Sequence, residues 1–422
     1  MQSEAFFHQI LELGNDWKVS SINFRKDDNT VEIHIQETPS IWERVRCKED
    51  GGQQKAYDHL EARRWRHLNI FQYRCEIVCA LPRGKCMHCG KVATLQAPWE
   101  GKAKGFTLAF ESMCILLLRE MTMSALAEFV GEHDTRLWRT LMRYTDNGMA
   151  AKDMSKVDVV CCDELNIRKG QSYATVFADG RRREVLFAVL TNKAHTWKDF
   201  RSSFVEHQGD PDSVRWISMD MSAAYQKGAR ENMPNAQLVF DKFHVIKLAN
   251  DAVDQVRRRE MAMRKEDRPA IKGSRFVWLK NPENLTERQK ATLVRMKDMN
   301  LVTATAYQMR LNLQEIYNES EDEIRAHKRL DEWSAWVLKT AKDNPLLAPM
   351  KRLAETIGKH MHGILAYWAH RLTNAYMEGL MSVFSATKRK ARGFRNFLYL
   401  RTMLYFTASN LDLPLHPAFH SK

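Results

Sequence analysis

Alternating hydrophobic and polar positions mark the first hundred residues as β-rich. Val31, Ile33 and Ile35 alternate with polar neighbours, and the polar run 26–29 supplies a turn, so residues 17–36 are predicted to form a hairpin. Cys75 and Cys79 are expected to be core residues, because free cysteine packs as a small hydrophobic side chain. They belong to a second alternation that places six residues on one face of a strand: Phe71, Tyr73, Cys75, Ile77, Cys79 and Leu81.

Two further cysteines have the spacing of a metal-binding turn. Cys86 and Cys89 are separated by two residues, which allows both thiolates to bind one tetrahedral zinc ion. The matching upstream segment starts at Cys47 and has Asp50 in place of a second cysteine. One interpretation is a zinc site of Cys47, Asp50, Cys86 and Cys89, with His88 as a substitute ligand. The other interpretation is a pair of tight turns that bind no metal.

Residues 104–145 have a helical period. Long apolar stretches predict a helix over 106–119, a shorter helix over 124–130 that Ser124 caps, and a third helix over about 135–144, with Gly131 breaking the second from the third. Within the third helix the basic side chains share one arc and the apolar side chains another. The basic residues are Arg136, Arg139 and Arg143, and the apolar residues are Leu137, Leu141 and Tyr144. This order predicts a helix-turn-helix that binds DNA through its third helix, while the alternative is a helical bundle with a solvated basic face.

From residue 156 the pattern changes to strands. Three β-rich runs, 157–162, 173–178 and 184–190, precede a region in which strands alternate with helices: a helix over 197–207, a strand ending at Asp220, a helix from Ser222, a strand over 237–240 and a helix over about 244–259. This order predicts a mixed sheet. The runs before Asp163 and Asp220 each stop on a carboxylate, and two like charges at neighbouring strand ends favour a divalent cation between them. Paired cations of this kind support phosphodiester cleavage.

The remainder of the chain is predicted to be helical. Thr286 and Gln289 fit a capping box, and the hundred residues after Arg259 form either a separate helical domain or an insertion. Asn374 and Glu378 share one helix face. Gly379 costs about 1 kcal/mol inside a helix, which suggests that another group approaches closely there. Five basic residues follow and are expected to bind phosphates: Lys388, Arg389, Lys390, Arg392 and Arg395.

Charge and composition narrow the class of protein. The 422-residue chain is long enough for several domains, and its net charge of +13 favours a polyanionic partner. It contains no apolar stretch long enough to span a membrane, and residues 1–4 do not resemble a signal peptide. We therefore expect a cytoplasmic protein whose eight cysteines form no disulfides.

Linked motifs across residues 47–396 resemble the ISL-three group of bacterial insertion-sequence transposases, which are Asp-Asp-Glu enzymes. The motifs are Asp163-Glu164 with Arg168-Lys169-Gly170 and Tyr173-Ala174-Thr175; Asp220-Met221 with Tyr225; Pro234-Asn235-Ala236 with Asp241-Lys242-Phe243-His244-Val245; and Asn374 with Glu378-Gly379, Lys388-Arg389 and Gly393-Phe394. Two positions depart from the family pattern. Asp50 stands where cysteine is usual, and Met381 stands where asparagine is frequent, three residues after the glutamate.

The resemblance implies a mixed α/β fold: a ribonuclease-H-like catalytic core with a large helical insertion, preceded by a β-rich zinc-binding-like module and a helix-turn-helix. The implied segments are 1–100 for the β-rich module, 101–150 for the helix-turn-helix, 151–259 for the first part of the core, 260–360 for the insertion and 361–422 for the last part of the core. The resemblance implies that Asp163, Asp220 and Glu378 bind Mg²⁺ or Mn²⁺, with two ions at the site.

Further roles follow from the same resemblance. Asp241, His244 and Asn374 are expected to support the site, and Arg168 and Lys169 are expected to contact DNA. The implied function is a transposase that acts as a homodimer on terminal inverted repeats and target DNA and performs strand cleavage and transfer. Met381 and the incomplete zinc pair support a second hypothesis, a DNA-binding regulator with an impaired core. A third hypothesis is a metal-dependent nuclease without strand transfer. The resemblance also implies a bacterial, nucleoid-associated protein.

Overall fold

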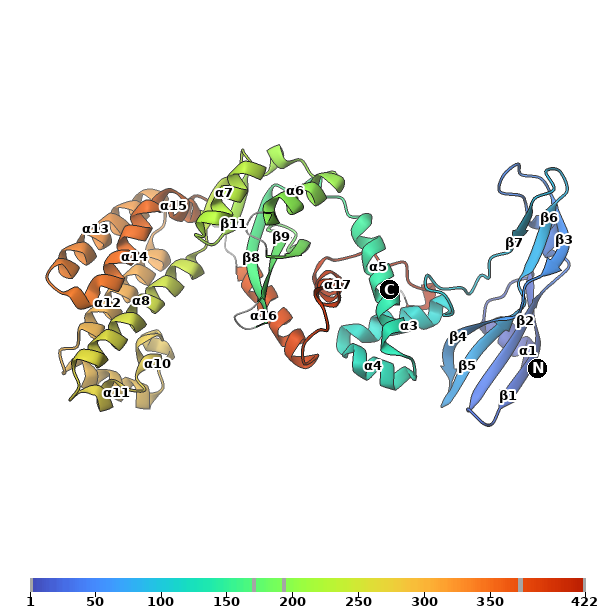
Figure 1. Cartoon of the computed structure of the whole chain (residues 1–422), viewed down its shortest axis with the longest axis horizontal. Helices are drawn as coiled ribbons and strands as arrows, with labels where there is room; N and C mark the ends of the chain where they lie inside the picture. The colour runs from blue at the N-terminus through green and yellow to red at the C-terminus, as the bar shows by residue number, and fades with distance from the viewer. Residues whose placement is uncertain (1–2, 169–171, 192–194, 371–374, 420–422) are drawn as a thin grey trace. The chain divides into compact units, whose positions relative to one another are not determined.

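The computed structural model describes residues 3–168, 172–191, 195–370 and 375–419, and it contains two compact units (Figure 1). Unit 1 comprises Met1–Ala151, Thr387–Thr407 and Leu411–Lys422, and unit 2 comprises Lys152–Ala386 and Ala408–Asn410. No helix within the described ranges is long and apolar enough to cross a membrane. All eight cysteines are free, as expected.

The β-rich part of unit 1 contains two sheets. A four-stranded sheet has the order β1-β2-β5-β4, and a three-stranded sheet has the order β3-β6-β7. The elements are α1 (Ser3–Ile10), β1 (Trp17–Arg25), β2 (Thr30–Glu37), α2 (Ile41–Arg44), β3 (Gln54–His59), β4 (Arg63–Ile70), β5 (Tyr73–Cys79), β6 (Pro82–Cys86) and β7 (Val92–Thr94).

The predicted hairpin and the predicted core cysteines are confirmed. β1 and β2 pair antiparallel around the turn at 26–29, and β2 pairs parallel with β5. Cys75 and Cys79 are buried in the core that lies on this sheet. The prediction for Phe71 is wrong, because this residue lies in the turn between β4 and β5 with a φ of 52° and is 89% exposed. The turn reverses the chain and points Phe71 into solvent, although the alternation of residue types continues through it.

Three helices follow in unit 1: α3 (Leu108–Glu120), α4 (Met123–Val130) and α5 (Asp134–Ala150). Their order was predicted, but α5 extends six residues further than the pattern suggested, and Thr122 rather than Ser124 caps α4. Gly131 ends α4 in the left-handed region, with a φ of 65° that glycine adopts at little cost.

The chain returns to unit 1 near its C-terminus. The last residues of α16 (Ala375–Lys390) and most of α17 (Phe397–Ala408) belong to this unit. Met403, Phe406 and Leu413 join the same apolar cluster as α3, α4 and α5, and Tyr399 stacks on Trp138 with ring centroids 4.3 Å apart. The basic segment 388–395 therefore packs with the three helices, whereas the sequence interpretation assigned it to the catalytic core.

Unit 2 is built on a five-stranded mixed sheet of order β10-β9-β8-β11-β12. Its strands are β8 (Val159–Arg168), β9 (Ser172–Asp179), β10 (Glu184–Leu190), β11 (Trp216–Met219) and β12 (Gln237–Phe240). β8, β9 and β10 pair antiparallel, whereas β8, β11 and β12 run parallel. The prediction of a mixed sheet is confirmed. A parallel neighbour requires a crossover connection, and helices supply it here.

Helices make up the rest of unit 2, and no strand follows β12 among the residues that the structure describes. The helices are α6 (Thr196–Glu206), α7 (Ala223–Asn232), α8 (Lys242–Met263), α9 (Arg268–Ile271), α10 (Arg275–Trp278), α11 (Glu287–Lys297), α12 (Val302–Glu319), α13 (Glu323–Lys342), α14 (Ala348–Lys359) and α15 (Met361–His370). Short 3-10 helices lie at Pro211–Ser213, Pro282–Asn284, Pro345–Leu347 and, in unit 1, Pro417–Phe419. The predicted capping box of Thr286 and Gln289 is present at the start of α11.

Helices α12, α13 and α14 lie side by side in Figure 1, where α14 also packs on α8. The helical stretch thus packs around α8, the helix that follows the last strand of the sheet.

Candidate active site and nucleic-acid interface

Three aspartates stand level with one another on the parallel strands of the sheet. Ser218 of β11 pairs with Cys161 of β8, so that two residues further on Asp220 and Asp163 lie opposite each other. Met219 pairs with Phe240 of β12, so that Asp241 comes next to Asp220 on the other side. Continuing the register by one or two residues thus puts the three carboxylates in one row.

The expectation that β8 ends at Asp163 is wrong. β8 continues to Arg168, and Asp163 pairs with Val176 of β9. Only the pairing with β11 stops, after Cys161. Asp163 therefore lies where β8 loses its parallel neighbour and keeps its antiparallel one, which leaves its side chain facing the carboxyl ends of β11 and β12.

Burial and neighbouring charges act on Asp163. Burial raises the pKa of its carboxyl group, Asp220 and Asp241 raise it further, and the amide of Glu164, which donates a 2.7 Å hydrogen bond to Asp163 Oδ1, opposes them. His244, at the start of α8, lowers the same pKa and has its Nε2 4.0 Å from Asp163 Oδ1.

Glu378 on α16 belongs to the same electrostatic group. Burial raises its pKa to about 7, and the charges of Asp241 and Asp163 contribute. Asp241 itself is only 1% exposed. The charges of Asp163 and Asp241 thus act on Glu378, and those of Asp220 and Asp241 act on Asp163. Asn374 falls outside the described residues.

The arrangement of these carboxylates suits a divalent cation. Like charges held together in a partly buried site destabilise the charged forms, and a cation bound by carboxylate oxygens offsets that repulsion. The four acidic side chains are nevertheless less tightly grouped than the ligand atoms of the N-terminal cluster described below. That cluster is the one group of three or more such ligands within 4.8 Å of one another in the described ranges.

Tyr225 and Glu164 are connected to Asp163 by hydrogen bonds, and the sequence interpretation gave neither of them a role. The buried Tyr225 hydroxyl donates to Glu164 Oε1 at 2.9 Å and is hydrogen-bonded to the hydroxyl of Thr175. Tyr225 thereby holds Glu164 in place, and the Glu164 amide holds Asp163. Their presence in the linked motifs was the available signal, since a buried phenol needs a hydrogen-bond partner.

Gly379, the residue after Glu378 on α16, borders open space. A Cβ added at Gly379 would meet no atom within 4 Å, so the expected close approach of another part of the protein is not seen among the described residues. Met381 is partly buried on the same helix. The space at Gly379 remains accessible to a ligand.

In unit 1 the predicted zinc ligands come together. Two turns of the same type, 47–51 and 86–90, each end in a glycine with a φ of 72°. In each turn the glycine amide donates a hydrogen bond to the cysteine carbonyl oxygen, from Gly51 to Cys47 and from Gly90 to Cys86. The pairing of β3 with β6 places the turns next to each other. As a result the ligand atoms of Cys47, Asp50, Cys86 and Cys89 all lie within 4.8 Å of one another.

The environment of this cluster lowers the pKa of two ligands and raises that of a third: burial, together with hydrogen bonds to Asp50, Cys86 and Cys47, raises the pKa of the Cys89 thiol to about 12. Amide hydrogen bonds from Cys89 and His88 lower the pKa of the Cys86 thiol. The amide of Gly52 and then the side chain of His88 lower the pKa of Asp50, whose Oδ2 lies 2.9 Å from His88 Nδ1. Three thiols and one carboxylate at these distances fit a tetrahedral zinc ion, and His88 contacts the carboxylate from outside the set.

The apolar face of α5 is buried as predicted. On the basic face, Arg136 and Arg143 contact other residues of unit 1, whereas Arg139 does not contact a polar partner among the described residues. Arg136 pairs with Glu132 and lies over the Phe106 ring with its guanidinium carbon 4.2 Å from the centroid, and Arg143 donates to the carbonyl oxygen of Lys102. Arg139 is exposed and has no hydrogen bond or ion pair to a described residue. Two of the three arginines therefore hold the segment that leads into α3, and Arg139 is left for a ligand.

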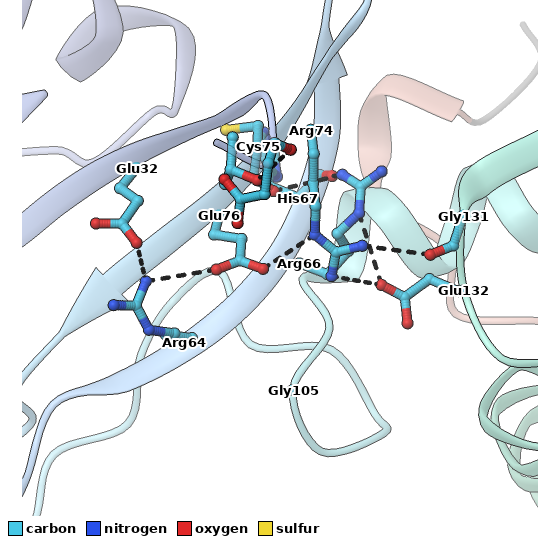
Figure 2. A network of polar contacts seen from close by, with 12 residues as sticks. Glu32, Arg64, Arg66, His67, Arg74, Cys75, Glu76, Gly105, Gly131 and Glu132 are labelled. Carbon is cyan, nitrogen blue, oxygen red and sulfur yellow. Dashed lines mark hydrogen bonds and ion pairs between the residues drawn. The ribbon is translucent and has the colours of Figure 1, made fainter. Parts of the chain in front are cut away.

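An arginine network fixes the turn between α4 and α5 to the four-stranded sheet. Figure 2 shows Arg66 and Arg74, from β4 and β5, directed at Gly131 and Glu132 of that turn. Arg74 Nη2 lies 2.7 Å from Glu132 Oε1, and Arg66 Nη2 donates to the carbonyl oxygen of Val130 at 3.3 Å. The side chains of Arg66 and Glu132 are both only 3% exposed. The turn that orients the third helix is thus held from the sheet side.

The basic segment 388–395 contacts the helices of unit 1 through Phe394, which lies edge-on to Trp138, and through polar side chains. Lys390 Nζ donates to the Glu120 carbonyl oxygen at 2.6 Å, and Arg395 Nη2 lies 3.3 Å from an oxygen of Asp134 at the start of α5. A cavity of about 550 Å³ lies between this segment and α4 and α5. Arg389 and Arg392 are exposed, Lys388 is partly buried, the side chain of Arg168 is not described, and Lys169 lies outside the described residues.

Comparisons with known proteins match the chain over most of its length. Residues 160–404 match a family model described as a transposase, and residues 95–145 match the helix-turn-helix domain of transposase family ISL3. The chain is 27% identical over 404 residues to the transposase for insertion sequence element IS1001 of Bordetella parapertussis, covering 93% of this chain and 96% of the relative. It is 23% identical over 430 residues to the transposase for insertion sequence element IS1557 of Mycobacterium tuberculosis, covering 94% and 93%.

Proposed function

Because the chain belongs to the ISL3 family of transposases, we propose that it is a DNA transposase of an insertion sequence. It binds the terminal inverted repeats of the element and catalyses cation-dependent strand cleavage followed by strand transfer. The observation that carries this proposal is the row of Asp163, Asp220 and Asp241 on adjacent parallel strands, with Glu378 within range of their charge.

The strand order supports a ribonuclease-H-like core. Three antiparallel strands followed by two parallel strands on the far side of the first one, in the order β10-β9-β8-β11-β12, agree with the fold that the resemblance implies. The core then extends from β8 to α16, and the helices between α8 and α15 form an insertion within it. The segments 1–100, 101–150, 151–259 and 260–360 remain our proposal for the domains. The last segment, 361–422, is divided in this proposal, because Thr387–Thr407 and Leu411–Lys422 belong to unit 1.

The roles of the acidic residues follow from their exposure. Asp163, Asp220 and Glu378 are partly accessible and hold Mg²⁺ or Mn²⁺, in a site for two ions, whereas the nearly inaccessible Asp241 acts on them through its charge. Such cations polarise the scissile phosphate and stabilise the attacking and leaving oxygens. His244 and Glu164 fix the position of the Asp163 carboxylate. The protein thus contributes mainly orientation, and no covalent enzyme intermediate is needed.

The test uses neutral variants of each acid. Asp163→Asn, Asp220→Asn and Glu378→Gln abolish cleavage of a DNA fragment that carries the element's ends, in Mg²⁺, while gel-shift binding of the same fragment is unchanged. Asp251→Asn serves as the control, because Asp251 is an exposed acid on α8. Full strand transfer by all three variants contradicts the assignment.

The same assay separates the two alternative hypotheses, the regulator and the nuclease. Wild-type protein that binds the ends and leaves them uncut in Mg²⁺ or Mn²⁺ is a regulator, and protein that cuts without joined products is a nuclease. Restoring asparagine by Met381→Asn identifies the cause, because only a defect at that position is corrected by this substitution.

DNA binding is assigned to unit 1. Arg139, Arg389 and Arg392 are the exposed basic residues that contact DNA, whereas Arg136, Arg143, Lys390 and Arg395 act mainly through the contacts described above. Replacing Arg139 or Arg389 by glutamine lowers the slope of log affinity against log salt by about 0.9 for each phosphate that the variant no longer neutralises. An unchanged slope in both variants excludes these residues as phosphate ligands.

Two further assignments complete the proposal. Cys47, Asp50, Cys86 and Cys89 hold a structural zinc ion that joins the two turns of the N-terminal module. A homodimer forms on DNA, since two element ends must be brought together before joining. Mass photometry of the protein with a fragment that carries one end tests the stoichiometry, and two protomers for each pair of ends is the expected result.

A further inference from the structure

A second polar cavity lies in unit 2. It has a volume of about 200 Å³ and lies beside β12, between α7 and the turn that joins α14 to α15. Phe240, which ends β12 and directly precedes Asp241, also lines it. Four basic side chains line the cavity: Arg230, Lys359, His360 and His362.

The charges in this cavity are not balanced. No carboxylate lines it, and none of the four basic side chains forms an ion pair with a described residue. Burial lowers the pKa of His360, and the cations of Lys359 and Arg230 lower it further, so these groups lie close enough to repel one another. An anion bound between them offsets this repulsion.

Packing fixes one of the four basic side chains, His360, whereas Arg230, Lys359 and His362 are exposed at the mouth of the cavity. A Cβ at Gly363 would lie 2.5 Å from the Phe240 ring, so glycine at this position lets α15 approach β12 closely. The His360 ring packs edge-on against Phe240, with centroids 5.4 Å apart and an interplanar angle of 83°. Gln226, which is buried, is fixed by a 2.9 Å hydrogen bond to the carbonyl oxygen of Met221. His360 is therefore oriented by packing rather than by a polar partner.

The shape and donors of the cavity indicate the class of ligand. Arginine, lysine and imidazole groups donate hydrogen bonds to phosphate oxygens, and arginine matches two of these oxygens at once. His362 and Gly363, from the first turn of α15, also line the cavity. A carboxylate-rich peptide would need a longer groove than this compact cavity offers.

We propose that the cavity lined by Arg230, Lys359, His360 and His362 binds a phosphate group. The phosphate comes either from the backbone of bound DNA or from a free phosphate in solution. The first source rests on the proposed function, because it requires that the protein binds DNA. The second does not, so the two can be tested separately.

The first measurement is calorimetric titration of the full chain with inorganic phosphate at constant ionic strength and pH 7. The double variant Arg230→Gln/Lys359→Gln is compared with Lys227→Gln, a control that removes an exposed lysine on α7 outside the cavity. We expect the double variant to bind phosphate at least about tenfold more weakly than the wild type, since each charge-assisted hydrogen bond contributes about that factor. The control is expected to bind as the wild type does. Because phosphate also stabilises proteins non-specifically, the difference between variants is the readout.

The second measurement identifies the source. Affinity for a DNA fragment carrying the element's ends is followed against salt for the same variants. A backbone phosphate in the cavity makes the slope in the double variant smaller by about 0.9 than in Lys227→Gln. If the double variant binds phosphate more weakly and the slope of its DNA affinity against salt is unchanged, the site is assigned to free phosphate. If neither signal changes in the double variant, the proposal is overturned, and circular dichroism of each variant shows that the comparison is between folded proteins.

If the proposed function fails, DNA binding is absent from every variant and the phosphate titration still distinguishes the double variant from its control. If the cavity proposal fails, the variants bind phosphate equally while end cleavage continues. The two failures therefore give different results.

Discussion

The arginine network at the turn between α4 and α5 gives a prediction whose size can be worked out from the structure. In Glu132→Gln the side chain keeps its size and loses its charge. Glu132 is 3% exposed and faces Arg66, Arg74 and Arg136. Removing one partner of a buried ion pair costs about 3–5 kcal/mol, because the remaining charge is left without compensation.

The exposure of each arginine indicates where the loss of stability in Glu132→Gln lies within the range of about 3–5 kcal/mol. The side chains of Arg74 and Arg136 are 31% and 38% exposed, so water compensates part of their charge, and Arg74 keeps Glu76 at 3.0 Å. Arg66 is 3% exposed, and its Nε has no hydrogen-bond partner among the described residues. Only Arg66 is left without a carboxylate partner, and it keeps its hydrogen bonds to carbonyl oxygens such as that of Val130, so we expect a loss near the lower limit, about 3 kcal/mol.

Differential scanning calorimetry of the full chain measures this loss. For a unit of roughly 180 residues, 1 kcal/mol corresponds to about 2–4 °C, so the transition of unit 1 is expected to fall by about 6–12 °C while that of unit 2 stays constant. Gel-shift binding of the element's ends is expected to weaken in parallel, since the turn orients α5. Glu128→Gln, an exposed glutamate on α4, is the control. A decrease no larger than that of Glu128→Gln refutes the reasoning.

Three other predictions concern separate parts of the molecule. Burial, followed by the charge of Arg66, lowers the pKa of His67 to about 4. Unit 1 is therefore fully stable above the unfolded-state value of about 6.5 and loses stability as the pH falls toward 4, and in urea unfolding curves against pH His67→Gln is expected to flatten this decline. Cys86→Ser is expected to abolish zinc in metal analysis of the purified protein while His88→Gln retains it, and absence of zinc from His88→Gln contradicts the ligand set. Gly379→Ala is expected to raise the free energy of unfolding by about 0.5–1 kcal/mol, because its Cβ meets open space, and to slow end cleavage where DNA approaches α16; unchanged cleavage rules out that approach.

Local sequence patterns were sufficient to predict the position of most individual helices and strands. The alternation in 17–36, the boundaries of β10 and β12 and the capping box at Thr286 all depend on residues near one another in the chain, and the structure agrees with each. The tertiary setting explains the exceptions. Phe71 fits the period of the strand that follows it, but a turn takes it out of the sheet, and no local pattern distinguishes an apolar residue in that turn from one in the core.

The basic residues show a second limit of sequence reasoning. A charge run and a basic helix face both predict contact with phosphates, and exposure is what separates binding residues from structural ones. Arg136 and Arg143 interact with Glu132 and with the 102–106 segment, which their spacing on the helix does not reveal. Arg139, one turn from each of them, has no such partner among the described residues and is the better candidate.

Asp241 shows most clearly why the site could be predicted only in part. The run before it is apolar and stops on a carboxylate, as do the runs before Asp163 and Asp220, so the local signal is the same for all three. The order of the strands distinguishes these three aspartates from an aspartate at the end of any other apolar run, because β11 lies between β8 and β12 and pairs parallel with both. Register then sets the carboxylates level, and the most deeply buried of them must act through its charge on the others rather than through access to DNA. The supporting role proposed for Asp241 thus rests on its place in the sheet.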